Sequence, residues 1–217
     1  MPTAKAQLPF FKRTLRFVDG TSDARLLEHV HEYREHLLAQ SLPNQEGEEA
    51  PLPCFEVEVI WRAHLLSLAA YVNDCRTLLD CKSARSPVEH GHHPAGDYDD
   101  DVVLRPGGGG GTMNVSSEWA TGLVAAVRQQ QSFMRQILQL REAGLATTEH
   151  LTTELEAYRS FMIAAGKLDV VTVGAKHELP VPSLLVDLLW HTHMLTPGRY
   201  ASQCERIAGR FIDHDAA

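Results

Sequence analysis

The stretch LLVDLLWHTHMLTPGRYASQC, residues 184–204, has a counterpart of equal length in FEVEVIWRAHLLSLAAYVNDC, residues 55–75. The two stretches align without a gap. An acid, a tryptophan, a histidine, a leucine, a tyrosine and a cysteine recur at intervals of 3, 3, 2, 5 and 4 in both. Glu58, Trp61, His64, Leu66, Tyr71 and Cys75 match Asp187, Trp190, His193, Leu195, Tyr200 and Cys204. This correspondence indicates an internal duplication.

Each copy is expected to form two helices joined by a tight corner. Pro197 lacks a backbone donor and disfavours helix at Thr196, whereas proline suits the first turn of a new helix. The second copy should therefore contain one helix ending near Leu195 and another that runs from Pro197 until Gly209 stops it. Ser67 stands where Thr196 does, so the first copy should turn the same corner.

Apolar residues at helical spacing predict further helices around the two copies. The predicted helices cover residues 21–40, 55–66, 68–79, 116–144 and 147–166. The stretch up to Val18 is mixed and leaves its structure open. β-branched residues between Leu168 and Val173 suggest one short extended segment. We therefore expect an all-α protein in which two related helix–corner–helix repeats pack with long central helices.

The stretch SPVEHGHHPAGDYDDDVVLRPGGGGG, residues 86–111, is typical of a linker, because its glycines lose much backbone entropy and bury no side chain. The predicted organisation is a first helical unit, a linker and a second helical unit over residues 1–85, 86–112 and 113–217. The two units are expected to form one joint domain. The linker's histidines could bind a transition metal, although such tracts are more often solvated spacers. They are His90, His92 and His93.

The composition excludes several classes of protein. Of 217 residues, 44% are hydrophobic and 22% are charged, which is typical of a globular protein and not of a disordered chain. The net charge is −8, of which residues 44–50 hold −3 and residues 86–111 hold −4, so the remainder is nearly neutral. Nucleic acid is therefore an improbable partner. No apolar run is long enough to span a membrane, and the N-terminus does not resemble a signal peptide. Four cysteines without a CxxC pair favour a reducing, cytoplasmic location.

The histidines of the second copy suggest a metal site, but their spacing restricts it. His191 and His193 are two residues apart and point about 200° from each other on a helix, so they cannot both bind one ion. His191 shares a face with Asp187, four residues earlier. The first copy has Glu58 and Arg62 at these positions. Because arginine is not a metal ligand, an exposed ion pair explains what both copies share.

His64 and His193 occur in both copies and have two possible roles. Each imidazole could bond a free carbonyl at its helix end. Alternatively, the two histidines could meet across a pseudo-twofold axis, with His191, Asp187 or His214 completing a zinc-like site.

Other shared and polar residues are expected to be structural. The repeated tryptophans and tyrosines should be core aromatics, and Cys75 and Cys204 buried small hydrophobes. The tail residues around His214 are either a ligand cluster or solvated polar residues.

The string VPSLLVDLLWHTHMLTPGRYASQCERIAGRFIDHD resembles the pattern of the glycine-rich domain-containing protein family, known from plants and fungi with bacterial relatives. The resemblance rests on VDLLWHTH, the tyrosine seven residues further on, and the closing glycine and HD. It implies no defined biochemical activity; plant members are linked to stress and developmental responses. Arg62 stands where the family often has the first histidine of the motif, which weakens a symmetric metal site.

Two functions follow from these observations. The first is an intracellular helical interaction or regulatory domain with a protein partner, favoured because the sequence contains no nucleotide-binding loop, nucleophile elbow or HExxH motif. The second is a metal-dependent protein or enzyme with a His-based site for a zinc-like transition metal between the two repeats.

Overall fold

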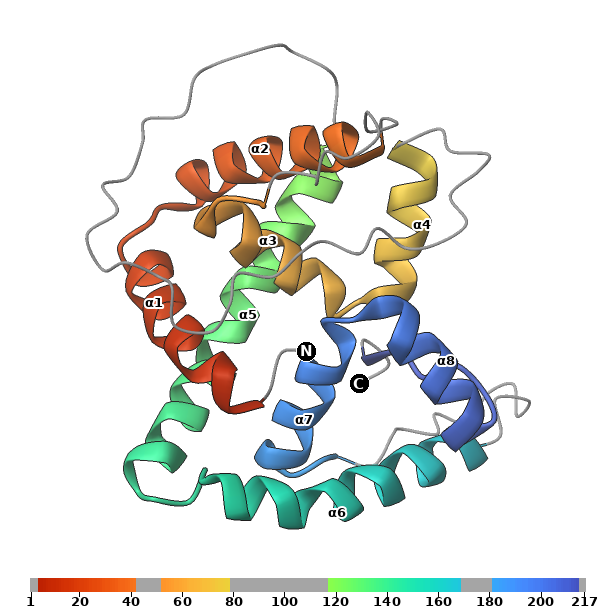
Figure 1. The fold of residues 1–217 in the computed structure, drawn as a ribbon. Coiled ribbons are helices and arrows are strands. Elements are labelled where there is room, and N and C mark those ends of the chain that lie inside the picture. The colour runs from red at the N-terminus through yellow and green to blue at the C-terminus, as the bar shows by residue number, and fades with distance from the viewer. Residues whose placement is uncertain (1–3, 42–51, 79–116, 169–180, 215–217) are drawn as a thin grey trace.

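The computed structural model describes residues 4–41, 52–78, 117–168 and 181–214, and these residues form eight α-helices, one 3₁₀ turn and no strand (Figure 1). The predicted all-α class is confirmed. The elements are η1 (Ala4–Ala6), α1 (Gln7–Asp19), α2 (Asp23–Ser41), α3 (Phe55–Leu65), α4 (Leu68–Leu78), α5 (Ser117–Glu142), α6 (Thr148–Lys167), α7 (Leu184–Met194) and α8 (Pro197–Ala208). The linker with its histidines, and nearly all of the suggested extended segment, lie outside the described residues.

Helix α1 covers the stretch that the sequence left open. Leu8, Phe11, Leu15 and Val18 are buried, and their spacing of three or four residues places them on one face of the helix. Pro9 lies in the first turn, where proline is tolerated because the N–H that it lacks would have no intrahelical partner. The apolar residues of this stretch have helical spacing, but a proline within it argues against a helix when the sequence is read alone.

The two helix corners make matching backbone hydrogen bonds. The N–H of Tyr71 donates to the carbonyl of Ser67 at 2.8 Å, and the N–H of Tyr200 donates to that of Thr196 at 2.8 Å. The predicted helix ends at the second corner are confirmed, since α7 ends at Met194 and α8 begins at Pro197. Gly209 follows α8 with φ of 74°, a left-handed conformation that favours glycine.

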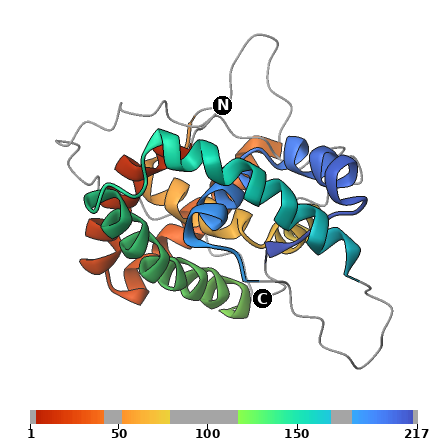
Figure 2. The same ribbon diagram turned by 90° about the horizontal axis from the view of Figure 1, so that it is seen from below.

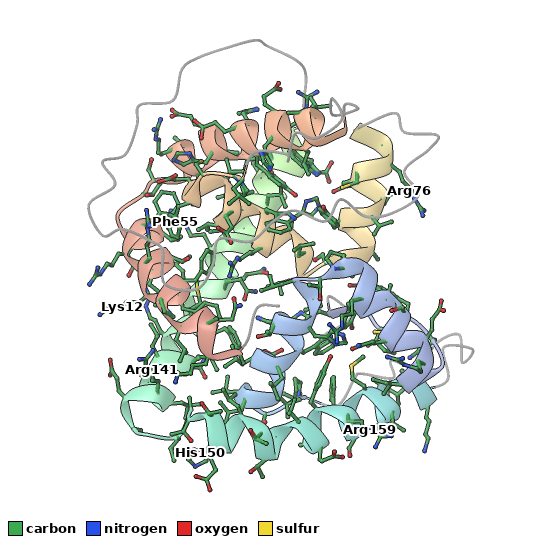
Figure 3. The ribbon with its side chains drawn as sticks, viewed as in Figure 1. Lys12, Phe55, Arg76, Arg141, His150 and Arg159 are labelled. Carbon is green, nitrogen blue, oxygen red and sulfur yellow. The ribbon has the colours of Figure 1, made fainter. Side chains whose placement is uncertain are left out.

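The helices α2–α4 and α6–α8 form two groups, and α5 contacts helices of both. In Figure 1, α2, α3 and α4 occupy the upper half and α6, α7 and α8 the lower half. Helix α5 packs against α1, α2 and α3 and also against α7. Viewed from below, α6 crosses in front of α7 (Figure 2). Charged side chains such as Lys12, Arg76 and Arg159 point away from the helices (Figure 3).

The repeated aromatic residues lie in the core, as predicted. Trp61, Tyr71, Trp190 and Tyr200 are all at most 2% exposed. Cys75 and Cys204 are buried as predicted, whereas Cys54 is exposed.

Helix α6 passes close to the end of α8 at Gly166. A Cβ added at Gly166 would lie 2.0 Å from the carbonyl oxygen of Ala208. Glycine is therefore required by close approach there and not as a helix stop, because α6 continues to Lys167. None of the described helices has the length and apolar character needed to cross a bilayer.

Candidate metal centre

Three side chains converge at one side of α7. Asp187 and His191 lie one helical turn apart on α7, and His214 returns to them from the segment after α8. The Nε2 atoms of His191 and His214 are 2.9 Å apart. Asp187 Oδ1 lies 3.0 Å from the His214 nitrogen and 3.3 Å from the His191 nitrogen. Three ligand atoms thus form a nearly equilateral triangle.

Hydrogen bonds alone satisfy this triangle poorly. If both Nε2 atoms carried protons, two N–H groups would meet at 2.9 Å and repel each other. If only one of them carries a proton, that N–H faces two acceptors at similar distances, the other imidazole nitrogen and Asp187 Oδ1. A cation inside the triangle would instead be approached by three lone pairs. The geometry is therefore compatible with a set of metal ligands.

The protonation states suit a cation. Burial alone would raise the pKa of Asp187, but its interactions with His191 and His214 outweigh burial and hold that pKa far below its usual range. Burial lowers the pKa of His191, although Asp187 opposes the decrease. Asp187 is therefore ionised and His191 neutral at neutral pH, which are the forms that bind metals.

An aromatic ring lies beside each of the two imidazoles of the triangle. The His191 ring lies 4.4 Å from that of Phe133, and the His214 ring lies 4.7 Å from that of Trp190, measured between centroids. His191 is buried, while the side chains of Asp187 and His214 are 19% and 23% exposed. Solvent can therefore reach the triangle from the side of Asp187 and His214.

His193 takes no part in this group. Its Nδ1 lies 2.8 Å from the hydroxyl of Tyr158 on α6. Burial lowers the pKa of His193 to about 4, a decrease that the side chain of Gln203 opposes and the charge of Arg199 reinforces. His191 and His193 point to different partners, as their spacing predicted.

His64 belongs to a second polar cluster. Its Nδ1 lies 3.0 Å from the hydroxyl of Tyr33, and its Nε2 lies 3.1 Å from Asp74, which also accepts a hydrogen bond from Trp119. Burial would raise the pKa of Asp74, but the bonds from His64 and Trp119 lower it. Both ring nitrogens of His64 are thus engaged.

The predicted pairing of His64 with His193 in one metal site is therefore corrected. The two histidines hold tyrosines of different helices, Tyr33 of α2 and Tyr158 of α6, and neither belongs to the Asp187 group. The prediction that they bond helix-end carbonyls is also wrong, because the tyrosine hydroxyls occupy their Nδ1 atoms.

The first copy has an ion pair in place of the triangle. Arg62 donates to Glu58 through Nε at 2.9 Å and also through Nη2, and it donates to Gln7 at 2.7 Å. The ion pair expected from the sequence is present, but Glu58 is fully buried, so the expectation of an exposed pair is wrong. Arg62 also lies over the ring of Phe10.

Comparison with known proteins places the chain in context. The family model described as "Glycine-rich domain-containing protein-like" matches residues 110–203. The resemblance to the glycine-rich domain-containing protein family is thereby confirmed. In this family, glycine-rich domain-containing protein 2 of Arabidopsis thaliana is 24% identical over 216 residues, covering 91% of this chain and 26% of the relative. Glycine-rich domain-containing protein 1 of the same organism is 24% identical over 199 residues, covering 82% and 23%.

The chain thus spans about a quarter of the length of these two relatives. The family match includes Asp187 and His191 and ends before His214. No solved structure matches the chain.

Sequence reasoning named all three residues of the triangle but missed the partners of the shared histidines. Tyr33, Tyr158 and Asp74 carry no local motif that marks them. The matching bonds to Tyr33 and Tyr158 extend the likeness of the two halves to α2 and α6, where the aligned stretches do not reach.

Proposed function

We propose that this chain binds a divalent transition metal through Asp187, His191 and His214. One observation carries the proposal: three ligand atoms of three side chains lie 2.9, 3.0 and 3.3 Å apart. An ion about 2.0–2.1 Å from two donors spans about 2.9 Å between them at a right angle and about 3.4 Å at the tetrahedral angle. The edges of the triangle fall in this range.

The donor set favours zinc or iron(II). Two imidazoles and one carboxylate bind zinc where a fourth position stays open, and they form the three-ligand face of non-haem iron(II) sites. A metal held by these three residues would keep at least one position for water or another ligand. The neighbouring Phe133 and Trp190 would shield the His191 and His214 rings from water, which strengthens the bonds to a cation.

A regulatory or interaction role, a protein partner and a cytoplasmic location stay predictions from the sequence. Metal binding is compatible with each of them. A metal that joins α7 to the segment after α8 would fix that segment against the helix, and such a link can serve either a structural or a catalytic role.

The test is zinc binding to chelator-treated protein, followed by competition with a chromophoric chelator and by elemental analysis. We expect one zinc per chain and a loss of affinity of at least about 100-fold in His214→Ala, because even residues outside the ligand set change metal affinity 10- to 100-fold. His31→Ala removes an exposed histidine of α2 and serves as the matched control.

Circular dichroism of each variant checks that the helices persist. The proposal fails if no stoichiometric zinc, iron(II), cobalt or manganese is bound, or if the control loses as much affinity as His214→Ala.

A further inference from the structure

His214 lies outside α7, unlike the other two residues of the candidate metal centre. Asp187 and His191 lie one turn apart on that helix, so helical geometry alone sets their relative position. His214 belongs instead to residues 209–214, the segment that follows α8. The placement of the 209–214 segment therefore decides whether the three ligand atoms meet.

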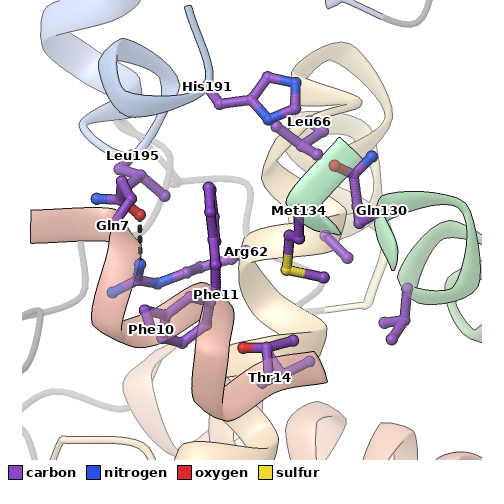
Figure 4. Close-up of a pocket in the computed structure, with 13 residues that line it drawn as sticks. Gln7, Phe10, Phe11, Thr14, Arg62, Leu66, Gln130, Met134, His191 and Leu195 are labelled. Atoms are coloured by element: carbon purple, nitrogen blue, oxygen red, sulfur yellow. Dashed lines mark hydrogen bonds between the residues drawn. The ribbon is translucent and has the colours of Figure 1, made fainter. Parts of the chain in front are cut away.

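The pocket beside His191 offers no ligand that could replace His214. This pocket, of about 50 Å³, lies between α1, α3, α5 and α7 (Figure 4). The described residues that line it together with His191 include no acidic residue, no cysteine and no second histidine. Within the described part of the chain, only His214 joins Asp187 and His191 with ligand atoms less than 4.8 Å apart. A complete three-ligand site thus requires His214 to be held in place.

A buried tyrosine of α8 connects the 209–214 segment to α7. The Tyr200 hydroxyl donates to the carbonyl of Ile212 at 2.6 Å and accepts from Nε1 of Trp190 at 2.7 Å. All three residues are at most 3% exposed. Burial raises the pKa of Tyr200, so its hydroxyl keeps the proton that it donates. Because Ile212 stands two residues before His214, this bond fixes the backbone next to the ligand.

Trp190 also contacts His214 directly. The centroids of the two rings are 4.7 Å apart, and the rings are tilted by 57°. His214 is therefore constrained twice, through its ring by Trp190 and through its backbone by the hydroxyl that Trp190 itself bonds. Trp190 and Tyr200 are the repeated tryptophan and tyrosine of the second copy, so the duplicated motif contacts the candidate centre from its buried side.

Two other hydrogen bonds hold the 209–214 segment nearer to solvent. Arg210 donates to the carbonyl of Ala165 at 2.7 Å, and Asp213 accepts from the N–H of Ala69 at 3.3 Å. These bonds are not fully buried, so water can replace them at little cost. The bond from Tyr200 is buried, and losing it leaves a carbonyl without a partner in the core. The Tyr200 bond is therefore expected to constrain the segment most.

We infer that Tyr200 is a positioning residue of the metal centre, which holds His214 against the two ligands of α7 through the carbonyl of Ile212. The effect on metal affinity rests on the proposed function, whereas the placement of His214 does not. Removing the hydroxyl should let the segment move, so that a metal must bring His214 back to the other two ligands when it binds.

The first experiment measures zinc affinity in Tyr200→Phe, which removes the hydroxyl and keeps the ring in the core. We expect the affinity to fall about tenfold, the lower end of the effect of residues behind metal ligands, because Tyr200 acts through the backbone. Tyr71→Phe removes a hydroxyl from the corresponding, equally buried position of the first copy. This control should leave zinc affinity unchanged. Circular dichroism checks that the helices persist in both variants.

A double-mutant cycle with His214→Ala separates positioning from a general loss of structure. In the His214→Ala background, Tyr200→Phe should not lower the residual zinc affinity further, because the residue that it positions is absent. Nuclear magnetic resonance titration of the His191 ring measures this weak binding. The inference is overturned if Tyr200→Phe lowers the affinity equally in both backgrounds, or if it leaves the affinity of the original chain unchanged.

A measurement on the zinc-free protein tests the placement of His214 by itself. Nuclear Overhauser contacts between the rings of His214 and Trp190 should be present in the original chain and in Tyr71→Phe, and weaker in Tyr200→Phe. If the original chain binds no zinc, the proposed function fails, but these contacts still decide whether Tyr200 positions His214. Contacts of equal strength in all three proteins would overturn the inference.

Discussion

Residues 58 and 62 on α3 and residues 187 and 191 on α7 occupy corresponding turns of two similar helices, yet they differ in what they can bind. In α3, Arg62 fills the space beside Glu58 with a guanidinium that has only donors. In α7, His191 offers a lone pair beside Asp187, and His214 adds another. Arginine or histidine at this position, together with His214 in the second copy, thus separates the Glu58–Arg62 ion pair from the candidate ligand set.

The corner histidines show the opposite trend, because their contacts are alike. His64 packs edge-on against Tyr71 with centroids 5.1 Å apart, and His193 packs against Tyr200 at 4.9 Å. Each also meets a tyrosine of the preceding long helix. The difference lies one helix further on, where Asp74 in the first copy corresponds to Gln203 in the second. The two halves thus share the contacts of the corner histidine and differ in the residue, Asp74 or Gln203, that stands near it.

The largest effect is expected when the ion pair between Glu58 and Arg62 is broken. Arg62→Met leaves the carboxylate of Glu58 buried without its partner, which should lower the free energy of unfolding by about 3–5 kcal/mol. His191→Met removes a neutral group next to a partly exposed carboxylate and should cost only about 1 kcal/mol. Urea denaturation measures both variants. Equal losses would show that the two pairs do not differ as described.

The second prediction concerns a variant in which α7 carries, at residue 191, the arginine that α3 carries at residue 62. His191→Arg should restore an ion pair with Asp187, because Glu58 and Arg62 form that pair at the same spacing. Phe133 can face the new guanidinium as Phe10 faces Arg62. We expect zinc affinity to fall at least about 100-fold while the melting temperature stays close to that of the original chain. Retained zinc binding would exclude His191 as a ligand.

The fold could be predicted from local signals because most of its helices carry them. Pro197 marks the start of α8 and Gly209 marks its end. The apolar residues that predict the long helices lie within those helices. Thr147 caps α6 by accepting from the N–H of His150. Only α1, whose first turn contains Pro9, remained unassigned.

The candidate site was harder to predict because its partners are distant in sequence. Asp187 and His191 are related by helical spacing, but nothing local brings His214 to them across α8. The burial of Glu58 likewise depends on how α1 packs over α3, which places Gln7 and Phe10 around Arg62. Spacing determines which residues share a helix face, whereas tertiary packing determines which of those faces meet.

A third prediction concerns the close contact between α6 and α8 in the second half. In the second half α6 packs against both α7 and α8, and Gly166 permits the contact with Ala208. Gly166→Ala should lower stability by about 1–3 kcal/mol, because the new Cβ would overlap a backbone carbonyl. Gly122→Ala on α5 meets no atom within 4 Å and should stabilise by about 0.5–1 kcal/mol. Thermal and urea unfolding of both variants test the contact, and a neutral Gly166→Ala would contradict it.

The smallest predicted effect concerns Gln203, which takes the place that Asp74 has in the first copy. His193 has a pKa of about 4 in the folded chain, compared with about 6.5 when unfolded. The unfolded state therefore binds the extra proton first, so stability should be lost as pH falls from about 6.5 to about 4.

Gln203→Asp places a carboxylate beside His193 and should raise the pKa of that imidazole toward its unfolded value, because an opposite charge favours the protonated form. The stability lost between about pH 6.5 and pH 4 should then be smaller than in the original chain. Nuclear magnetic resonance titration of the His193 ring, with a chelator present, measures the pKa, and urea unfolding across the same range measures the stability. Gln203→Glu tests whether the carboxylate must stand at the distance that aspartate gives. If the ring titrates near 4 in all three proteins, the residue at position 203 does not distinguish the two corners, and burial together with the charge of Arg199 determines the protonation of His193.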